Sequence, residues 1–196
     1  MPNDTRAYVA KYVEDLHALV THGLRPISRQ VDEAHARDHT EAAALIADLQ
    51  RTLTQHERLL SDHLRSLGSS PSTPTTGVQD AAAAIAGMVA GLYNQMRSEA
   101  VSKSVRDDYT FMSHCAVSWL MLMSTARSLG EHETEELAEQ GYRDCSRLVM
   151  EIDRVMPGLV VQELQQDGFS AQPVADWAHH IVSDAWNRQQ VNSGVA

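Results

Sequence analysis

Aromatic residues and cysteines are scarce in this chain. Phe, Trp and Tyr together make up 5% of its 196 residues, and there are 2 cysteines. The interior must therefore be built mainly from Ala, Leu, Val and Met, which suits close helix packing better than a β-sandwich. Two cysteines give no disulfide framework, and their low number is typical of a reduced protein in the cytoplasm.

Long apolar runs and basic clusters are also missing. The longest apolar run, Cys115 to Met123, contains Ser118 and is too short to span a bilayer. The polar first residues predict no signal peptide before the first helix. A formal net charge of −10, without a Lys/Arg cluster, argues against DNA, RNA or an anionic membrane as partner. The chain has no phosphate loop or nucleophile elbow, so an enzyme is the less favoured interpretation.

Helical periodicity is what the chain does have. The spacing predicts one helix from about Arg6 to Ala34, with a kink near His22 to Pro26 because proline disrupts a helix interior. A second helix runs from about Thr40 to Leu67 and ends at Gly68. Its core-facing seam contains two histidines, and it consists of Leu49, Leu53, His56, Leu60, His63 and Leu67.

The second half of the chain shows three further helices and a last one. A Pro/Ser/Thr-rich linker at about residues 68–77 precedes a small-residue helix that starts near Val78. The next helix, from Val105 to Gly130, is apolar nearly all round in its middle. A short turn leads to a helix over Glu133 to Val155, which Pro157 and Gly158 weaken, although LVVQELQQ at 159–166 can continue it. After Gly168, one amphipathic helix carries Val174, Trp177, Ile181 and Ala185 on one side.

This order predicts an all-α fold of two helical hairpins joined by a crossover, which is the connectivity of a ferritin-like four-helix bundle. Extra helices lie in the crossover region and at the C-terminus. We expect residues 1–168 to form the bundle, with the linker at about 68–77 inside it. Residues 169–196 then form a C-terminal amphipathic helix and tail that pack on the bundle or on a partner subunit.

Four segments carry a resemblance to a known family. They are YVEDLHALV at 12–20, HERLLSDHLRSLG at 56–68, IAGMVAGLY at 85–93 and ARSLGEHE at 126–133. In this order they resemble the ferritin-like YciE/YciF stress-protein family over roughly residues 8–165. The resemblance implies a compact and often dimeric helical bundle, a stress-associated role, and carboxylate and histidine ligands for a di-metal site.

The ligands that the resemblance implies are largely replaced in this sequence. The family's histidine on the second helix falls on His56, but its glutamate partner falls on Thr52 or Leu53. The inward glutamate of the first helix falls on Gly23, and that of the third helix falls near Cys115. His22 and His114 lie beside two of these positions. On the fourth helix Asp144 stands where an acidic ligand is expected, but no Glu-x-x-His occurs there. The di-metal centre is therefore predicted to be altered or lost.

The lengths of the two helical hairpins indicate, independently of the resemblance, that four candidate ligands lie at one height in the bundle. His22 and His56 are equally far from the turn near His39, and Cys115 and Cys145 are equally far from Gly130. Because each helical residue rises by about 1.5 Å, all four should lie at one height. Two imidazoles and two thiols form a possible zinc ligand set. The alternative is a metal-free core in which the cysteines pack as small apolar residues.

Three hypotheses about function follow. The first is a cytoplasmic, stress-associated binding protein that works as a homodimer, with the subunit contact at Trp119 on the apolar helix or at Trp177 and Trp186 on the last helix. The second is a zinc or iron metalloprotein with an unusual ligand set. The third is a bundle that binds a small organic or haem-like ligand through His56 or His114. The candidate metal ligands are His56, His22, Cys115, Cys145 and Asp144.

Overall fold

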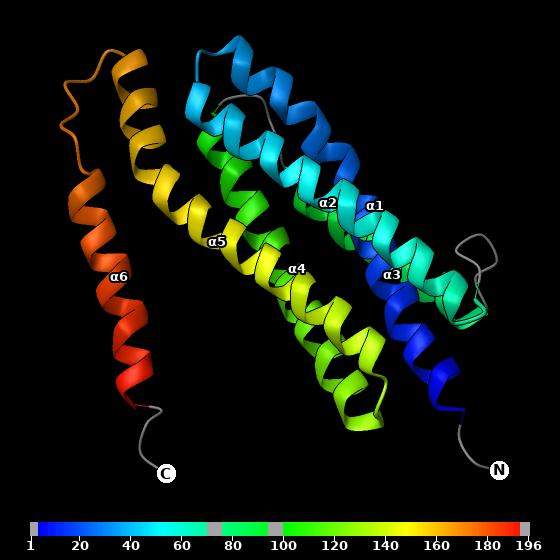
Figure 1. The fold of residues 1–196 in the computed structure, drawn as a ribbon. Helices are drawn as coiled ribbons and strands as arrows, with labels where there is room; N and C mark the ends of the chain where they lie inside the picture. Colours follow the sequence, from blue (N-terminus) through cyan, green and yellow to red (C-terminus); the bar gives the residue numbers. More distant parts are fainter. Residues whose placement is uncertain (1–3, 70–75, 94–99, 193–196) are drawn as a thin grey trace.

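The computed structural model describes the backbone of residues 4–69, 76–93 and 100–192. All regular secondary structure in these ranges is helical, with no strand (Figure 1). The all-α prediction is confirmed. The six helices are α1 (Thr5–Ala36), α2 (Thr40–Ser66), α3 (Thr76–Tyr93), α4 (Val101–Leu129), α5 (His132–Gln166) and α6 (Ala175–Asn192).

Four of these helices enclose the apolar core. Short turns pair α1 with α2 and α4 with α5, while α1 also packs on α4 and α2 packs on α5 (Figure 1). Helix α3 lies against α1 and α4. The expected seam of α2 does face this core at its first four positions, since Leu49, Leu53, His56 and Leu60 are buried. Farther along α2 the buried residue is Leu64 rather than Leu67.

Glycines follow three helices, and Gly68 and Gly130 end α2 and α4 as the sequence predicts. Gly68, Gly130 and Gly168 have φ of 81°, 76° and 87° after α2, α4 and α5. Residues with a β-carbon rarely adopt this left-handed conformation, so glycine is favoured at each stop. The linker was expected at about residues 68–77, but residues 70–75 lie outside the described ranges.

Two helices are longer than their clearest periodic segments. Helix α5 continues beyond Val155 through Pro157 and Gly158 to Gln166, which is the continuation that the sequence left open. Its extended end is held by tertiary contacts, because Gln162 Nε2 and Gln166 Nε2 donate hydrogen bonds to carbonyl oxygens of the α1–α2 turn at 3.1 and 3.3 Å. Helix α4 starts at Val101, earlier than expected.

The start of α4 receives its cap from another helix. Ala100, at the N-cap position, has no side chain that can accept a hydrogen bond. Glu163 of α5 takes that place, because its carboxylate accepts hydrogen bonds from the Ser102 backbone N–H at 2.9 Å and from the Ser102 hydroxyl. A carboxylate near a helix N-terminus satisfies free N–H groups and interacts favourably with the helix dipole.

The apolar helix α4 is divided into a buried and an exposed side. Phe111, Met112 and Trp119 lie in the core, whereas Val117, Leu120 and Met121 face solvent. The proposed subunit contact at Trp119 is therefore wrong, because the ring is fully buried within its own chain. Among the described residues, no helix is both long and apolar enough to cross a membrane.

Helix α6 packs only on α5 within the described residues. Ala178 and Val182 are half-buried along its length. Its expected apolar side does not pack on the bundle of its own chain, since Val174, Trp177 and Ile181 are exposed.

Removing the cap of α4 should destabilise the bundle. Glu163→Ala is expected to lower the free energy of unfolding by about 1 kcal/mol, because two hydrogen bonds at the helix start are lost. Urea unfolding followed by circular dichroism measures the change. Glu136→Ala, at an exposed position of the same helix, is the matched control and should change stability by less than about 0.5 kcal/mol. Equal effects of the two variants would contradict the capping role.

Candidate functional site

His56 is the polar residue at the centre of the bundle. Its side chain is 1% exposed, and its Nε2 lies 3.2 Å from Oδ2 of Asp144 on α5. Asp144 also accepts a hydrogen bond from Gln140 Nε2 at 2.9 Å. Burial lowers the pKa of His56, and the Asp144 carboxylate opposes part of that effect. A neutral ring that donates from Nε2 to Asp144 fits this arrangement.

The other edge of His56 is enclosed by apolar groups. The ring of Trp119 meets His56 edge-on, with centroids 5.1 Å apart and planes at 76°. His56 Nδ1 is buried and has no hydrogen-bond partner among the described residues. Burying a polar atom without a hydrogen bond lowers the stability of the folded protein, so the surrounding packing must offset this loss.

The two cysteines lie in the same region. Both are free thiols with no measurable exposure. Burial raises the pKa of each thiol well above its usual value; Asp144 adds to the effect at Cys145, and Cys145 adds to it at Cys115. The indole N–H of Trp119 opposes only part of the shift at Cys145. Metals bind the thiolate, so these neutral thiols behave as small apolar side chains.

His22 does not join the other four candidates. It lies on the exposed side of α1, whereas its neighbour Gly23 is buried and faces the core. The number of residues from a turn determines how far along its helix a residue lies, but it does not determine which side of the helix that residue occupies. His56 thus contacts Trp119 and Asp144, and both of these residues affect the pKa of Cys145, whereas His22 lies on the exposed side of α1.

Two aromatic rings of α4 fill the middle of the bundle by packing on two glycines. A β-carbon at Gly23 of α1 would lie 2.0 Å from Cζ of Phe111. A β-carbon at Gly141 of α5 would lie 2.3 Å from Cδ2 of Trp119. Both separations are far below van der Waals contact, so each ring lies directly on backbone that only glycine exposes.

These residues do not fit a di-iron or similar two-metal centre. The resemblance places a carboxylate at Gly23, where the Phe111 ring now lies. Its glutamates on the second and third helices fall on Thr52 or Leu53 and near Cys115, whose buried side chains supply no carboxylate. Asp144 of α5 is an acidic residue at an expected ligand position, but it is hydrogen-bonded by His56 and Gln140. Within the described ranges, no group of three or more His, Cys, Asp or Glu side chains is arranged to hold a metal ion.

The remaining polar candidates have structural partners. Glu57 lies 3.3 Å from His17 of α1, and Glu151 pairs with Arg154. Both carboxylates are therefore engaged in ion pairs. His63 Nε2 lies 2.8 Å from Thr134 Oγ1 of α5.

Sequence reasoning missed one buried contact between α1 and α4. Gln30 Nε2 donates a hydrogen bond to Asp108 Oδ1 at 3.1 Å, and both residues are buried. Acidic residues are common near helix starts, so the position of Asp108 does not by itself indicate burial. The polar residue Gln30 carried no signal, because it lies in a helix whose apolar pattern was clear without it.

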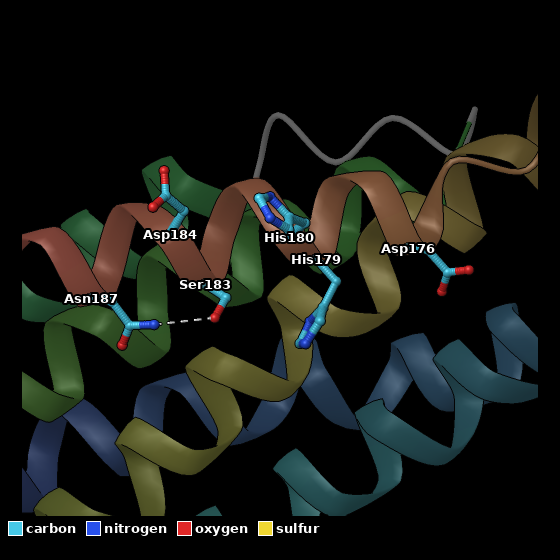
Figure 2. Close-up of a pocket in the computed structure, with 6 residues that line it drawn as sticks. All are labelled: Asp176, His179, His180, Ser183, Asp184 and Asn187. Carbon is cyan, nitrogen blue, oxygen red and sulfur yellow. Dashed lines mark hydrogen bonds between the residues drawn. The ribbon is translucent and has the colours of Figure 1, made fainter.

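A shallow hollow on α6 provides no convergent site. All of its lining residues come from this one helix, and Figure 2 shows His179 and His180 pointing to different sides of it. The one hydrogen bond drawn there runs from Asn187 Nδ2 to Ser183 Oγ at 3.4 Å. The lining residues are Asp176, His179, His180, Ser183, Asp184 and Asn187.

Comparisons with models of protein families, with curated proteins and with solved structures give no match. The similarity to the YciE/YciF family therefore depends on the four sequence segments.

The glycine contacts can be tested by adding one methyl group. Gly23→Ala and Gly141→Ala should each lower the free energy of unfolding by about 1–3 kcal/mol, because a ring must move out of its place. The matched control is Gly158→Ala in α5, where an added β-carbon meets nothing within 4 Å. This control should gain about 0.5–1 kcal/mol from its higher helix propensity. Thermal and urea unfolding measure all three, and stabilisation by all three would show that the rings do not lie on the glycines.

Acid should destabilise the protein through its buried histidines. Burial lowers the pKa of His56 and His63 below the usual value of 6.5. The unfolded chain then binds protons more readily than the folded chain, so stability is complete above about pH 6.5 and falls below it. In urea unfolding at about pH 7.5 and about pH 5.5, His56→Gln should reduce the loss between the two pH values. His22→Gln, which changes an exposed histidine, should leave that loss unchanged; an equal response of both variants would contradict the assignment.

Proposed function

We propose that this chain is a ferritin-like bundle, similar to the YciE/YciF family, whose di-metal centre has been replaced by packed side chains. The protein then acts by binding a partner through its surface, as a cytoplasmic and stress-associated homodimer. One observation carries this proposal. Phe111 on Gly23 and Trp119 on Gly141 occupy the middle of the bundle, where the family would hold its metal ligands.

Two further features support the proposal. The chain order of hairpin, α3 and second hairpin matches a ferritin-like connection. Large apolar side chains remain exposed on α4 and α6, and exposed apolar surface often marks a site of association.

The proposal predicts a protein without a resident metal. Elemental analysis of freshly purified protein, prepared without added metal or chelator, should find zinc and iron far below one equivalent per chain. An absorption spectrum of the same sample should show only the aromatic residues. A stoichiometric metal, or a coloured molecule that copurifies, would contradict the proposal, because a ligand beside His56 would have to displace the ring of Trp119.

A metalloprotein with an unusual ligand set is the second candidate. The observation that favours it is the series of neighbouring side chains from His56 to Asp144, from Asp144 to Cys145 and from Cys145 to Cys115. Binding would require deprotonation of at least one thiol and movement of Trp119. This candidate predicts one zinc or iron per chain that is lost in His56→Ala and kept in His114→Ala, a matched change at an exposed histidine.

A further inference from the structure

The two cysteines of this chain face each other across the α4–α5 pair. The ring of Trp119 on α4 lies against the backbone of Gly141 on α5, so these two positions are level along the bundle. Cys115 lies four residues before Trp119, and Cys145 lies four residues after Gly141, so the two cysteines are level as well. Both are fully buried, and Cys145 contributes to the raised pKa of Cys115. The two thiols are therefore neighbours in the core.

Helix geometry brings facing residues of such a pair within the span of a disulfide. Packed helices have axes about 8–10 Å apart, and their Cα atoms lie about 2.3 Å from each axis. Facing Cα atoms are then roughly 4–7 Å apart, and disulfides span Cα separations of about 4.4–6.8 Å. The missing side chain of Gly141 lets α4 and α5 approach closely one turn away from the cysteines. A bond between the two sulfur atoms thus needs no large movement of either helix.

Burial makes the oxidation of these thiols slow. The thiolate is the form that attacks an oxidant, whereas the raised pKa of Cys115 and of Cys145 keeps both thiols neutral. Neither cysteine is exposed, so an oxidant must be small and must enter during local openings of the packed helices. Brief contact with an oxidant then leaves the pair reduced, whereas sustained contact converts it.

We propose that Cys115 and Cys145 form a reversible disulfide within one chain during sustained exposure to hydrogen peroxide, and that this bond locks α4 to α5. One thiol reacts with the peroxide to give a sulfenic acid and one water. The second thiol attacks the sulfur of the sulfenic acid, and a second water leaves as the disulfide forms. The two thiols give up two electrons in total, and these reduce one peroxide to two waters. A small dithiol returns the pair to the reduced state by thiol–disulfide exchange.

Peroxide treatment of the folded full chain tests the proposal. The untreated chain has two free thiols, Cys115 and Cys145, and thiol titration in denaturant after treatment should find almost none. The intact mass should fall by two hydrogen atoms, apart from oxygen added at methionines, and non-reducing electrophoresis should show single chains. Dithiothreitol should restore both thiols. Met150, which is 67% exposed, shows that the oxidant was active in the same sample, because its thioether takes up oxygen.

Single-cysteine variants are the matched controls. Cys115→Ala and Cys145→Ala each remove one partner and keep the position apolar, so neither variant should lose two hydrogen atoms on treatment. The oxidised wild type should unfold at about 1–2 M more urea than the reduced wild type, because the closed loop restricts the unfolded chain. Peroxide should give neither alanine variant such a gain.

Several results would overturn the proposal. Two intact thiols after Met150 has become a sulfoxide would show that the folded pair does not react. Disulfide-linked dimers, sulfinic acids, or a disulfide that forms only in the presence of urea would show that the two thiols do not meet in the folded chain. A disulfide without a rise in the urea midpoint would overturn the lock between α4 and α5.

Discussion

The close approach of two aromatic rings to two glycines is the constraint on which the rest of this bundle depends. Phe111 lies on the backbone of Gly23, and Trp119 lies on the backbone of Gly141. Both rings come from α4, and the glycines come from α1 and α5, so the rings fix the spacing of three helices. A ring on a glycine brings many atoms into contact, and these dispersion contacts are individually weak but large in sum. They also explain how a chain with 5% aromatic residues fills its core.

Packing of this kind determines the chemistry of the nearby polar groups. Trp119 excludes water from one edge of His56, and Asp144 supplies a hydrogen bond on the other. The same burial keeps Cys115 and Cys145 protonated. A site built for metal would need the opposite conditions, with thiolates and lone pairs turned toward one point.

The sequence predicts the helices well because their signals are local. Apolar periodicity indicates each helix, and the stops at Gly68, Gly130 and Gly168 need only a left-handed residue. Local signals fail where contacts with a distant segment determine whether a helix continues. Pro157 looks like the end of a helix, but contacts from Gln162 and Gln166 to the α1–α2 turn accompany the continuation of α5. Helix propensity is a weak preference that tertiary contacts override.

In the candidate site, too, local spacing predicts some features, while others depend on how distant segments pack. Counting from the turns placed His56, Cys115 and Cys145 in one region, because heights along paired helices follow from chain length. It also included His22, whose orientation depends on the packing of α1. The available signal was the glycine itself. Gly23 and Gly141 each interrupt an apolar seam, and an aromatic residue on the facing helix is the natural occupant of the space that a missing side chain leaves.

A filled centre changes where function can lie. In a bundle with ligands at its middle, the surface needs only to keep the protein in solution, and apolar side chains there would be a liability. Here the middle holds Phe111 and Trp119, while α4 and α6 expose apolar side chains. Helix α4 links the two properties, because its buried side carries the rings and its opposite side carries Val117 and Met121. A partner that packs on the outer side would therefore press on the helix that positions both rings, so association and core packing should be energetically coupled.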